Sequence, residues 1–274
     1  MRHLPKSEIL VVDNLFRGCV DSVKGVDNVE FLKADVRSHV MKRIVESFDP
    51  DVIIHLAAIH YIPYCNEHPY ETFDVNVIGT LNVARLAENR FFLLASSASV
   101  YPDLNYPVSE DVEPSPSDVY GKTKLVAEEL VKSMCDEAVI ARIFNVYGEG
   151  DTNPHVIPEI LSQVKSGSRV VRLGNLTSVR DFIHVDDTCR ALSLLISRRE
   201  TGVFNIGSGC GFSIEQIVEM ISNILGEKID AVVIPSKIRK NDRPYLVADI
   251  TKIKKLGWKP RISLYKWLKR VLTT

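Results

Sequence analysis

An unbroken apolar run leads into two serines in the stretch Phe91-Phe92-Leu93-Leu94-Ala95-Ser96-Ser97. A short run of this kind is typical of a strand that is buried on both faces of a parallel sheet. Four more runs share this character and lie at residues 9–12, 29–32, 52–54 and 138–141. Helical patterns separate them at residues 40–48, 72–88 and 117–134. This alternation predicts an α/β fold with a doubly wound, Rossmann-like parallel sheet.

The front of this pattern differs from an ordinary dinucleotide-binding fold. Such a fold begins with a strand and a glycine-rich loop, and an acidic residue ends its second strand. Here the first strand already ends at the acidic Asp13, and the first glycine is Gly18. We therefore expect the usual first strand–helix unit to be missing, because of a mis-assigned start or a fragment, with a gap and two unpaired strand edges in the sheet. A degenerate or differently folded protein is the alternative.

Composition and charge exclude several classes of partner. The 34 Lys and Arg nearly balance 35 Asp and Glu, which argues against nucleic acid or an anionic membrane as a partner. No apolar run approaches the roughly 18 residues of a membrane-spanning helix, and the first residues do not resemble a secretion signal. The five cysteines are scattered without a C-x-x-C pair. We therefore expect no disulfide framework, no metal site and a cytoplasmic location.

The chemistry-bearing residues follow the serine pair. Tyr120 and Lys124 form a Tyr-x-x-x-Lys pattern within a predicted helix, so both side chains lie on one helix face. A nearby ammonium favours the phenolate, so we expect the tyrosine pKa to fall and the residue to act as a general base. A second such pair, Tyr265 and Lys269, lies on a basic terminal helix with no serine strand before it, and is interpreted as a surface feature.

The pattern of the sequence changes after about Tyr147. We expect a dinucleotide-binding domain at residues 1–147, to which residues 181–206 return. A smaller substrate-binding α/β domain is expected at residues 148–180 and 207–274. Gly207, Gly209 and Gly211 lie between a strand-like run and a helix capped at Ser213, but their spacing does not fit a phosphate-binding loop, so we interpret this segment as a turn.

The motifs of the chain, taken together and in order, resemble those of the extended short-chain dehydrogenase/reductase family, NAD-dependent epimerase/dehydratase, above all its UDP-glucose 4-epimerase branch. The motifs that carry the resemblance are Asp13-Asn14-Leu15, Ala34-Asp35-Val36-Arg37, His55-Leu56-Ala57-Ala58, Asn76-Val77-Ile78-Gly79-Thr80, Ser96 to Tyr101, Tyr120 to Lys124, Arg142 to Gly148, Arg180 to Asp187, Ala248-Asp249 and Leu256-Gly257-Trp258.

The resemblance implies roles for individual residues. Tyr120 is the base, Lys124 is its partner and a ribose ligand, and Ser97 stabilises the reacting hydroxyl, with Ser96 as the rival serine. The implied cofactor is NAD, bound by Asp13, Asn14, Asp35, Val36, Leu56, Ala57, Ala58 and Asn76, together with Tyr120 and Lys124. The implied substrate is a UDP-linked nucleotide sugar, bound by Ser97, Asn145, Arg180 and Arg239, of which the arginines suit a diphosphate.

The residues after Ser97 narrow the reaction that the resemblance implies. In the dehydratases of the family an Asp-Glu pair follows the serine position, whereas Ala98 and Ser99 stand here. We therefore expect a nucleotide-sugar 4-epimerase that acts by transient hydride transfer to NAD. The alternatives are a nucleotide-sugar reductase or another enzyme of the dehydratase family, and a truncated homologue without activity. The resemblance also implies a homodimer, formed through the helices at residues 72–88 and 117–134.

Overall fold

A computed structural model describes residues 7–151, 153–238 and 242–273, and the chain divides into two units. The first unit comprises Met1–Val100, Pro114–Arg142 and Leu192–Val203, and the second comprises Tyr101–Glu113, Ile143–Ala191 and Phe204–Thr274. Within the described residues no helix is both long enough and apolar enough to cross a membrane.

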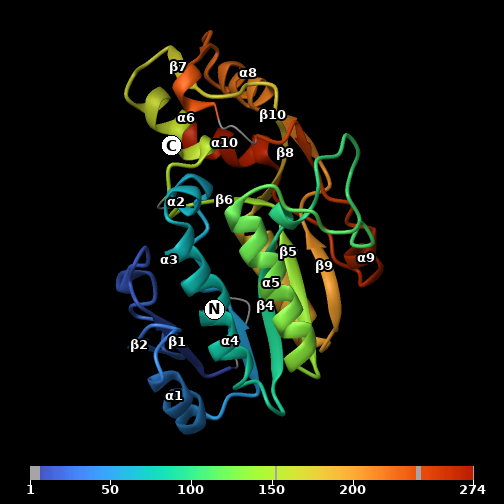
Figure 1. Ribbon diagram of the computed structural model, residues 1–274. Helices are drawn as coiled ribbons and strands as arrows, with labels where there is room; N and C mark the ends of the chain where they lie inside the picture. The colour runs from blue at the N-terminus through green and yellow to red at the C-terminus, as the bar shows by residue number, and fades with distance from the viewer. Residues whose placement is uncertain (1–6, 152, 239–241, 274) are drawn as a thin grey trace. The chain divides into compact units, whose positions relative to one another are not determined.

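The first part of the chain alternates strands and helices as expected (Figure 1). Its elements are β1 (Ile9–Asp13), η1 (Val20–Ser22), β2 (Val29–Lys33), α1 (Val40–Phe48), β3 (Val52–His55), α2 (Ile62–Glu67), α3 (Pro69–Phe73), η2 (Asp74–Ile78), α4 (Gly79–Ala84), β4 (Phe91–Ser97), η3 (Ala98–Val100), α5 (Val119–Met134) and β5 (Ala138–Ile143). All five strands predicted from apolar runs are present, and the predicted α/β fold class is confirmed.

The rest of the chain consists of shorter elements, and α7 and β9 contribute residues to both units. The elements are β6 (Asn145–Tyr147), α6 (Val156–Lys165), β7 (Val170–Leu173), β8 (Val179–His184), α7 (Val185–Ser197), β9 (Gly202–Ile206), β10 (Gly211–Ser213), α8 (Ile214–Leu225), β11 (Asp230–Val233), η4 (Pro235–Lys237), β12 (Tyr245–Leu246), α9 (Thr251–Lys255) and α10 (Leu264–Thr273). Strands β8, β10 and β12 form one small sheet with β6 beside β8, and β7 pairs in parallel with β11.

The strands of the first unit form two separate sheets. Strands β1 and β2 pair with each other in parallel, and β3, β4, β5 and β9 form a second sheet in that order. Among the described strands, no ladder joins β1 to β3. Close to this break, Ile54 on β3 and Leu56 just after it are 38% and 60% exposed. The expected gap and its unpaired strand edges are therefore present.

The prediction of one continuous helix over residues 72–88 is wrong in detail. The structure has α3, then a π-helical turn, η2, and then α4, which ends at Ala84. The π-turn contains Asn76, whose side chain hydrogen-bonds to the backbone of Ile59. The spacing of apolar residues in a sequence does not reveal the extra residue of a π-helical turn. Such turns are frequent at functional sites.

Each unit has its own apolar core. In the first unit, buried side chains of β3, β4 and β5 pack against those of α1, α4 and α5, with Phe92, Leu94 and Val131 fully buried. Figure 1 shows α5 lying across β4 and β5. In the second unit the core gathers around α6, α8 and α10. Helix α8 begins with a capping box between Ser213 and Gln216, as its sequence predicts.

The glycine-rich segment at residues 207–211 is a turn, as predicted, and it binds a carboxylate of the protein itself. Asp181 is fully buried and accepts hydrogen bonds from the backbone N–H of Ser208, Gly209 and Ala248, and from the Ser208 hydroxyl. Burial raises the pKa of Asp181, and these four donors act against that shift. The turn therefore anchors strand β8, and the Ser208 and Gly209 amides are occupied by this carboxylate.

Replacing Asp181 with Asn tests this anchor. In Asp181→Asn a side-chain NH2 group faces backbone N–H donors, which leaves buried groups unsatisfied. We expect a loss of about 1–3 kcal/mol in the free energy of unfolding, measured by urea denaturation. The matched control is Asp230→Asn, because Asp230 is exposed and pairs only with Lys228 among the ion pairs observed. It should change stability by less than about 0.5 kcal/mol. Equal losses in the two variants would contradict this assignment.

Candidate active site

The first turn of α5 lies directly on the backbone of the serine turn. Asp118 caps the helix by accepting a hydrogen bond from the Gly121 N–H at 2.7 Å. A methyl group at position 121 would lie 2.3 Å from the carbonyl oxygen of Ser99. Only glycine therefore permits this approach, which sets Tyr120 beside the end of β4.

The structure brings together the three residues predicted to be catalytic. The Ser97 hydroxyl lies close enough to the Tyr120 phenol for hydrogen bonding between them to lower the phenol's pKa. Ser97 is buried, and its hydroxyl also accepts the Ser99 N–H at 3.1 Å. Lys124, one turn after Tyr120 on α5, is 2% exposed, so its ammonium does not extend into bulk water. A phenol and a hydroxyl thus converge, with a buried amine on the same helix.

The protonation behaviour of Tyr120 differs from the expectation. Burial raises the pKa of the Tyr120 phenol above its usual range, and the hydrogen bond from Ser97 only partly offsets that shift. The predicted fall in its pKa caused by Lys124 is therefore wrong for this arrangement, because desolvation of the phenolate outweighs any such effect. Burial also lowers the pKa of Lys124 to about 8, against the opposing charge of Glu128.

The rival serine has a different partner. The Ser96 hydroxyl donates a hydrogen bond to a carboxylate oxygen of Glu128, on the buried side of α5. Ser96 and Ser97 lie next to each other on a strand, so their side chains point to opposite faces. This geometry favours Ser97 as the hydroxyl beside Tyr120.

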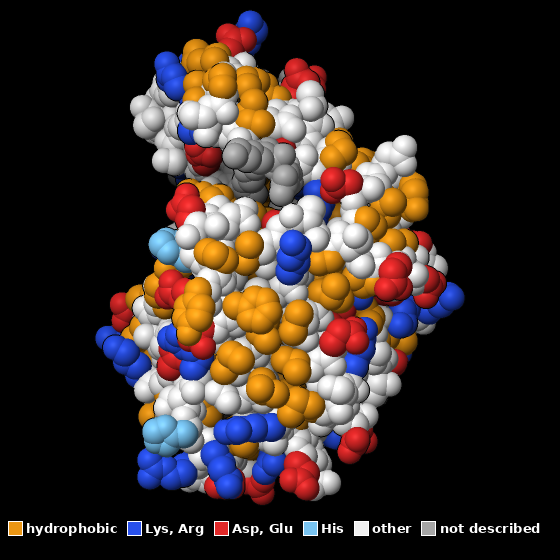
Figure 2. All heavy atoms as spheres, in the orientation of Figure 1, with side chains coloured by type: hydrophobic (Ala, Val, Ile, Leu, Met, Phe, Trp, Pro, Cys, Tyr) orange, Lys and Arg blue, Asp and Glu red, His pale blue; other side chains and the backbone are white. Residues whose placement is uncertain are grey.

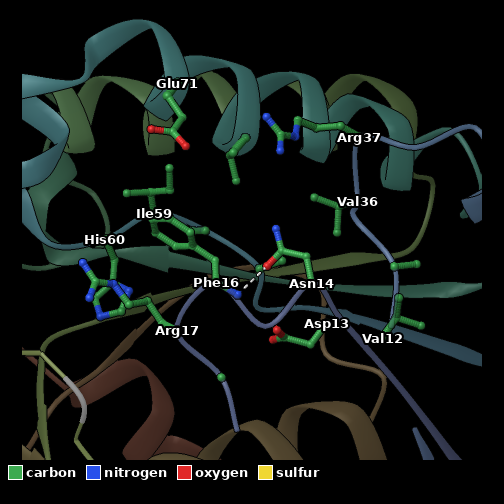
Figure 3. A pocket seen from close by; sticks show the side chains of 15 residues that line it. Val12, Asp13, Asn14, Phe16, Arg17, Val36, Arg37, Ile59, His60 and Glu71 are labelled. Atoms are coloured by element: carbon green, nitrogen blue, oxygen red, sulfur yellow. Dashed lines mark hydrogen bonds between the residues drawn. The ribbon is translucent and has the colours of Figure 1, made fainter. Parts of the chain in front are cut away.

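Several residues predicted to bind the cofactor line one pocket of the first unit (Figure 3). The predicted residues on its wall are Asp13, Asn14, Val36, Ala57 and Ala58. They come from the segments that follow β1, β2 and β3, at the edge where parallel strands end. In Figure 3 Asn14 and Val36 lie on one side of the pocket, and Phe16 and Ile59 lie on the other.

Hydrogen bonds within the loops shape this pocket. Asp13 accepts the Leu15 N–H at 2.6 Å, and a side chain at position 18 would crowd its carboxylate, which Gly18 leaves accessible. Asp35 accepts bonds from the Arg37 guanidinium and from the Asn14 amide at 2.9 Å. The Arg37 guanidinium holds the pKa of the Asp35 carboxyl well below its usual range. Asp35 therefore organises the loops and is not among the pocket residues.

Asn76, also predicted to lie near the cofactor, connects the pocket to the catalytic helix. Its amide oxygen accepts the Ile59 N–H at 2.8 Å, and its NH2 group donates to the Ile59 carbonyl and to the hydroxyl of Thr123 on α5. Ile59 lines the pocket, whereas Asn76 itself is buried behind it. Leu56 is largely exposed and is not part of the pocket wall.

Sequence reasoning missed several residues of the pocket wall. They are Val12, Phe16, Arg17, Gly18, Ala34, Arg37, Ile59, His60, Glu71 and Val75. Most of them lie in the loops after β1, β2 and β3, so the rule that ligands bind at the carboxyl ends of parallel strands would have indicated them. Glu71 and Val75 come from α3 and η2, and no sequence signal indicated that these elements reach the pocket.

The residues predicted to bind the substrate lie in the second unit, apart from Ser97. Asn145 is exposed at the start of β6. Arg180 donates a hydrogen bond to Asp242 at 2.7 Å, and Asp242 also accepts bonds from Asn175 and Ser178. Arg239 lies outside the described residues. Asp242, which supports Arg180, was not predicted.

The comparison with known proteins agrees with this geometry. The sequence model of the NAD dependent epimerase/dehydratase family matches residues 3–207. The chain belongs to this family. The UDP-glucose 4-epimerase of Corynebacterium glutamicum is 30% identical over 283 residues, which cover 92% of this chain and 83% of that protein. The GDP-6-deoxy-D-mannose reductase of Pseudomonas aeruginosa is 30% identical over 246 residues, covering 82% and 80%.

Solved structures show the same fold. The crystal structure of UDP-glucose 4-epimerase with UDP-glucose from Thermotoga maritima superimposes with a TM-score of 0.84 at 28% identity, and the match covers 96% of this chain and 89% of that one. NAD is the cofactor of the family. The pocket fits the adenosine part of NAD, because it combines the Asp13 carboxylate with apolar walls from Val36 and Ile59.

His55 is a buried titratable residue behind the catalytic helix. It ends β3, and its Nε2 lies 3.0 Å from the hydroxyl of Thr80, which in turn donates to the Asn76 carbonyl. Because Thr80 donates there, it accepts the Nε2–H of a neutral imidazole. Burial lowers the pKa of His55 to about 3, and the charge of Lys124 adds to that shift.

The buried imidazole should make stability depend on pH. Between pH 6.5 and 3 the unfolded chain binds a proton at His55 that the folded chain does not. Stability is therefore complete above pH 6.5 and falls with decreasing pH, by up to about 1.4 kcal/mol per pH unit for this group. We expect His55→Gln to flatten the dependence in urea unfolding at pH 7, 6 and 5. The exposed His39→Gln variant should keep the slope of the unmodified protein. Parallel slopes in all three proteins would contradict a buried neutral His55.

Proposed function

We propose that the protein is a 4-epimerase of UDP-linked nucleotide sugars, with Ser97, Tyr120 and Lys124 as its catalytic residues. The observation that carries the proposal is the close approach of the Ser97 hydroxyl to the Tyr120 phenol, on a helix that also carries the buried Lys124. Ala98 and Ser99 provide no carboxylate at the places that follow the serine. Without such a carboxylate the site has no group to catalyse an elimination, so the proposed reaction is limited to oxidation and reduction at one sugar carbon and proton transfer at its hydroxyl.

The side chains have separate roles in this proposal. NAD, when bound, supplies the reversible two-electron oxidation of the sugar carbon. The Tyr120 oxygen takes the proton of the sugar 4-hydroxyl and later returns it, while the Ser97 hydroxyl holds the same oxygen in line. Lys124, one helical turn after Tyr120 on α5, is proposed to bind the ribose of the cofactor. Return of the hydrogen to the opposite face of the sugar gives the epimer.

Cofactor and substrate are proposed to bind through different parts of the chain. Asp13 would bind the adenosine ribose hydroxyls, and its charge would repel a 2′-phosphate, which favours NAD over NADP. Arg180 and Arg239 are proposed to bind the nucleotide diphosphate of the substrate, and the Asn145 amide is proposed to bind the substrate as well. The first unit would therefore be the cofactor domain, and the second the sugar-nucleotide domain.

A nucleotide-sugar reductase is the second candidate. The similarity to the GDP-6-deoxy-D-mannose reductase supports it, at an identity equal to that of the C. glutamicum epimerase. The two candidates differ in their consumption of cofactor, since an epimerase regenerates its NAD in each cycle and a reductase oxidises one NADH or NADPH per turnover. Absorbance at the wavelength of the reduced nicotinamide separates them.

The proposed reaction can be tested by interconversion of UDP-glucose and UDP-galactose, and of their N-acetyl and uronic acid forms, with added NAD. Because Tyr120 is the proposed base, we expect Tyr120→Phe to lower kcat by about 10²–10⁴-fold with little change in KM. Chromatography of the nucleotide sugars provides the measurement.

The second Tyr-x-x-x-Lys pair offers a matched control. Tyr265 is 46% exposed on α10, so Tyr265→Phe should leave kcat unchanged. Tight NAD binding without turnover of any of these sugars would reject the epimerase. Absence of NAD affinity in calorimetry would instead support a homologue without activity.

We also propose that two copies associate through α3, α4 and α5. Figure 2 shows hydrophobic side chains gathered on the face that these helices form. Tyr70 and Phe73 of α3, Ile78 of η2 and Val126 of α5 are among the large exposed apolar residues. Helices α4 and α5 pack side by side, so two copies would join as a four-helix contact. A contiguous apolar patch of this kind is typical of an association surface.

Substitutions that introduce positive charges on this surface test the association. Ile78→Lys and Val126→Lys together would place four like charges in the contact of two copies, so we expect the double variant to be monomeric in light scattering. Both positions are exposed, and the fold should therefore persist in circular dichroism. Tyr265→Lys, on the other unit, should keep the mass of the unmodified protein. A dimer that survives the double substitution would reject this surface.

The cysteines support a proposal on location. All five cysteines are free thiols. Thiols of this kind persist in a reducing compartment, so we propose that the protein acts in the cytoplasm. Fractionation of cells that express the tagged protein would test this location.

A further inference from the structure

A buried ion pair joins α5 to β5 and has no catalytic or binding role in the proposed function. The Arg142 guanidinium on β5 donates two hydrogen bonds to the Glu128 carboxylate on α5, at 3.0 Å and 2.7 Å. The two side chains are 3% and 0% exposed. Such a bidentate pair fixes the distance and the rotation of the helix relative to the strand.

A third element is joined to the same carboxylate. Ser96 on β4 donates its hydroxyl to the Glu128 oxygen that also accepts the Arg142 Nε–H. Ser96 directly precedes Ser97, whose hydroxyl meets Tyr120 on the other face of the strand. The Glu128 carboxylate therefore ties the strand that carries Ser97 to the helix that carries Tyr120.

The same carboxylate lies one helical turn after Lys124. The charged and titratable groups that act on the Lys124 amine are Glu128 from its own helix and His55 from β3, with Arg142 paired to Glu128 from β5. His55 is neutral over the physiological range, since burial lowers its pKa to about 3. Glu128 is thus the negative charge that faces two buried cations, Lys124 and Arg142.

Stability alone is a weak explanation for this arrangement. The cost of desolvating two charges offsets much of their attraction, and buried pairs can often be replaced by apolar residues without loss of stability. The carboxylate of the pair is bonded to Ser96, the neighbour of Ser97, and its charge acts on Lys124, which points to a role in the site.

We infer that the Glu128–Arg142 pair is a positioning element of the active site, which keeps the Lys124 amine charged and holds Ser97 in register with Tyr120. Glu128 touches neither substrate nor cofactor in this account and acts through its neighbours. The inference deepens the proposed function and rests on it for its meaning, although the charge of Lys124 can be measured without turnover.

The test is the titration of the Lys124 amine in Glu128→Gln. With 13C-labelled lysine, and Lys124→Met to assign the signal, NMR follows the ammonium directly. Burial and the Glu128 charge together place the pKa of Lys124 at about 8. Removal of the opposite charge should lower the midpoint of the titration by about 1–3 pH units. In an active enzyme, the alkaline limb of the kcat/KM profile should move with it.

Two controls separate charge from packing. Glu129→Gln alters the next residue of the same helix, which is exposed and pairs with Lys132, and should leave the Lys124 titration unchanged. Ser96→Ala removes the hydroxyl but keeps both charges, so it should also leave the titration unchanged while lowering stability.

A second variant guards against unfolding. Glu128→Gln leaves a bare guanidinium in the interior, whereas Glu128→Gln with Arg142→Met removes both partners and should fold. Its Lys124 midpoint should move in the same direction by a smaller amount. An unchanged midpoint in folded Glu128→Gln, or in the double variant, would overturn the inference. A shifted midpoint in a protein without epimerase activity would reject the proposed function and leave the charge role of Glu128 standing.

Discussion

The packing of Gly121 against the Ser99 carbonyl is the contact on which the active site depends. A side chain at position 121 would push α5 away from the end of β4, and Tyr120 would no longer reach Ser97. Asp118 starts the helix at this point by capping the Gly121 N–H. On the far side, Glu128 ties the same helix to β4 and β5. Helix α5 is therefore fixed at its first turn and again at Glu128, and Lys124 lies between these two anchors.

Burial sets the chemistry of this corner. It raises the pKa of Tyr120 and lowers that of Lys124, so both groups favour their neutral forms more than they would in water. Glu128 opposes the effect at Lys124. Asn76 extends the network to the pocket wall by holding Ile59 and Thr123 together. The pocket lined by Asp13 and the proposed catalytic residues Ser97 and Tyr120 both lie in the first unit.

Much of this arrangement could be predicted from the sequence, because short apolar runs and the end of each strand are local signals. The five strands, the helices at residues 40–48 and 117–134, and the turn at residues 207–211 are of this kind. The π-turn at Asn76 was missed, since one inserted residue does not change apolar periodicity. The pairing of Arg142 with Glu128, and of Arg180 with Asp242, was missed because side-chain partners distant in sequence leave no local pattern. The predicted direction of the Tyr120 pKa shift was wrong, because the sequence motif shows the neighbouring Lys124 but not the burial of the phenol.

The central claim is that the protein inverts a sugar carbon whose hydrogen leaves as hydride and returns to the opposite face, while Ser97, Tyr120 and Lys124 act at the sugar hydroxyl. UDP-galactose deuterated at carbon 4 of the sugar tests this claim most directly, with mass spectrometry of the UDP-glucose formed in ordinary water. The account requires the product to keep its deuterium, because the hydrogen never exchanges with solvent. Product that has lost the label to water would contradict it.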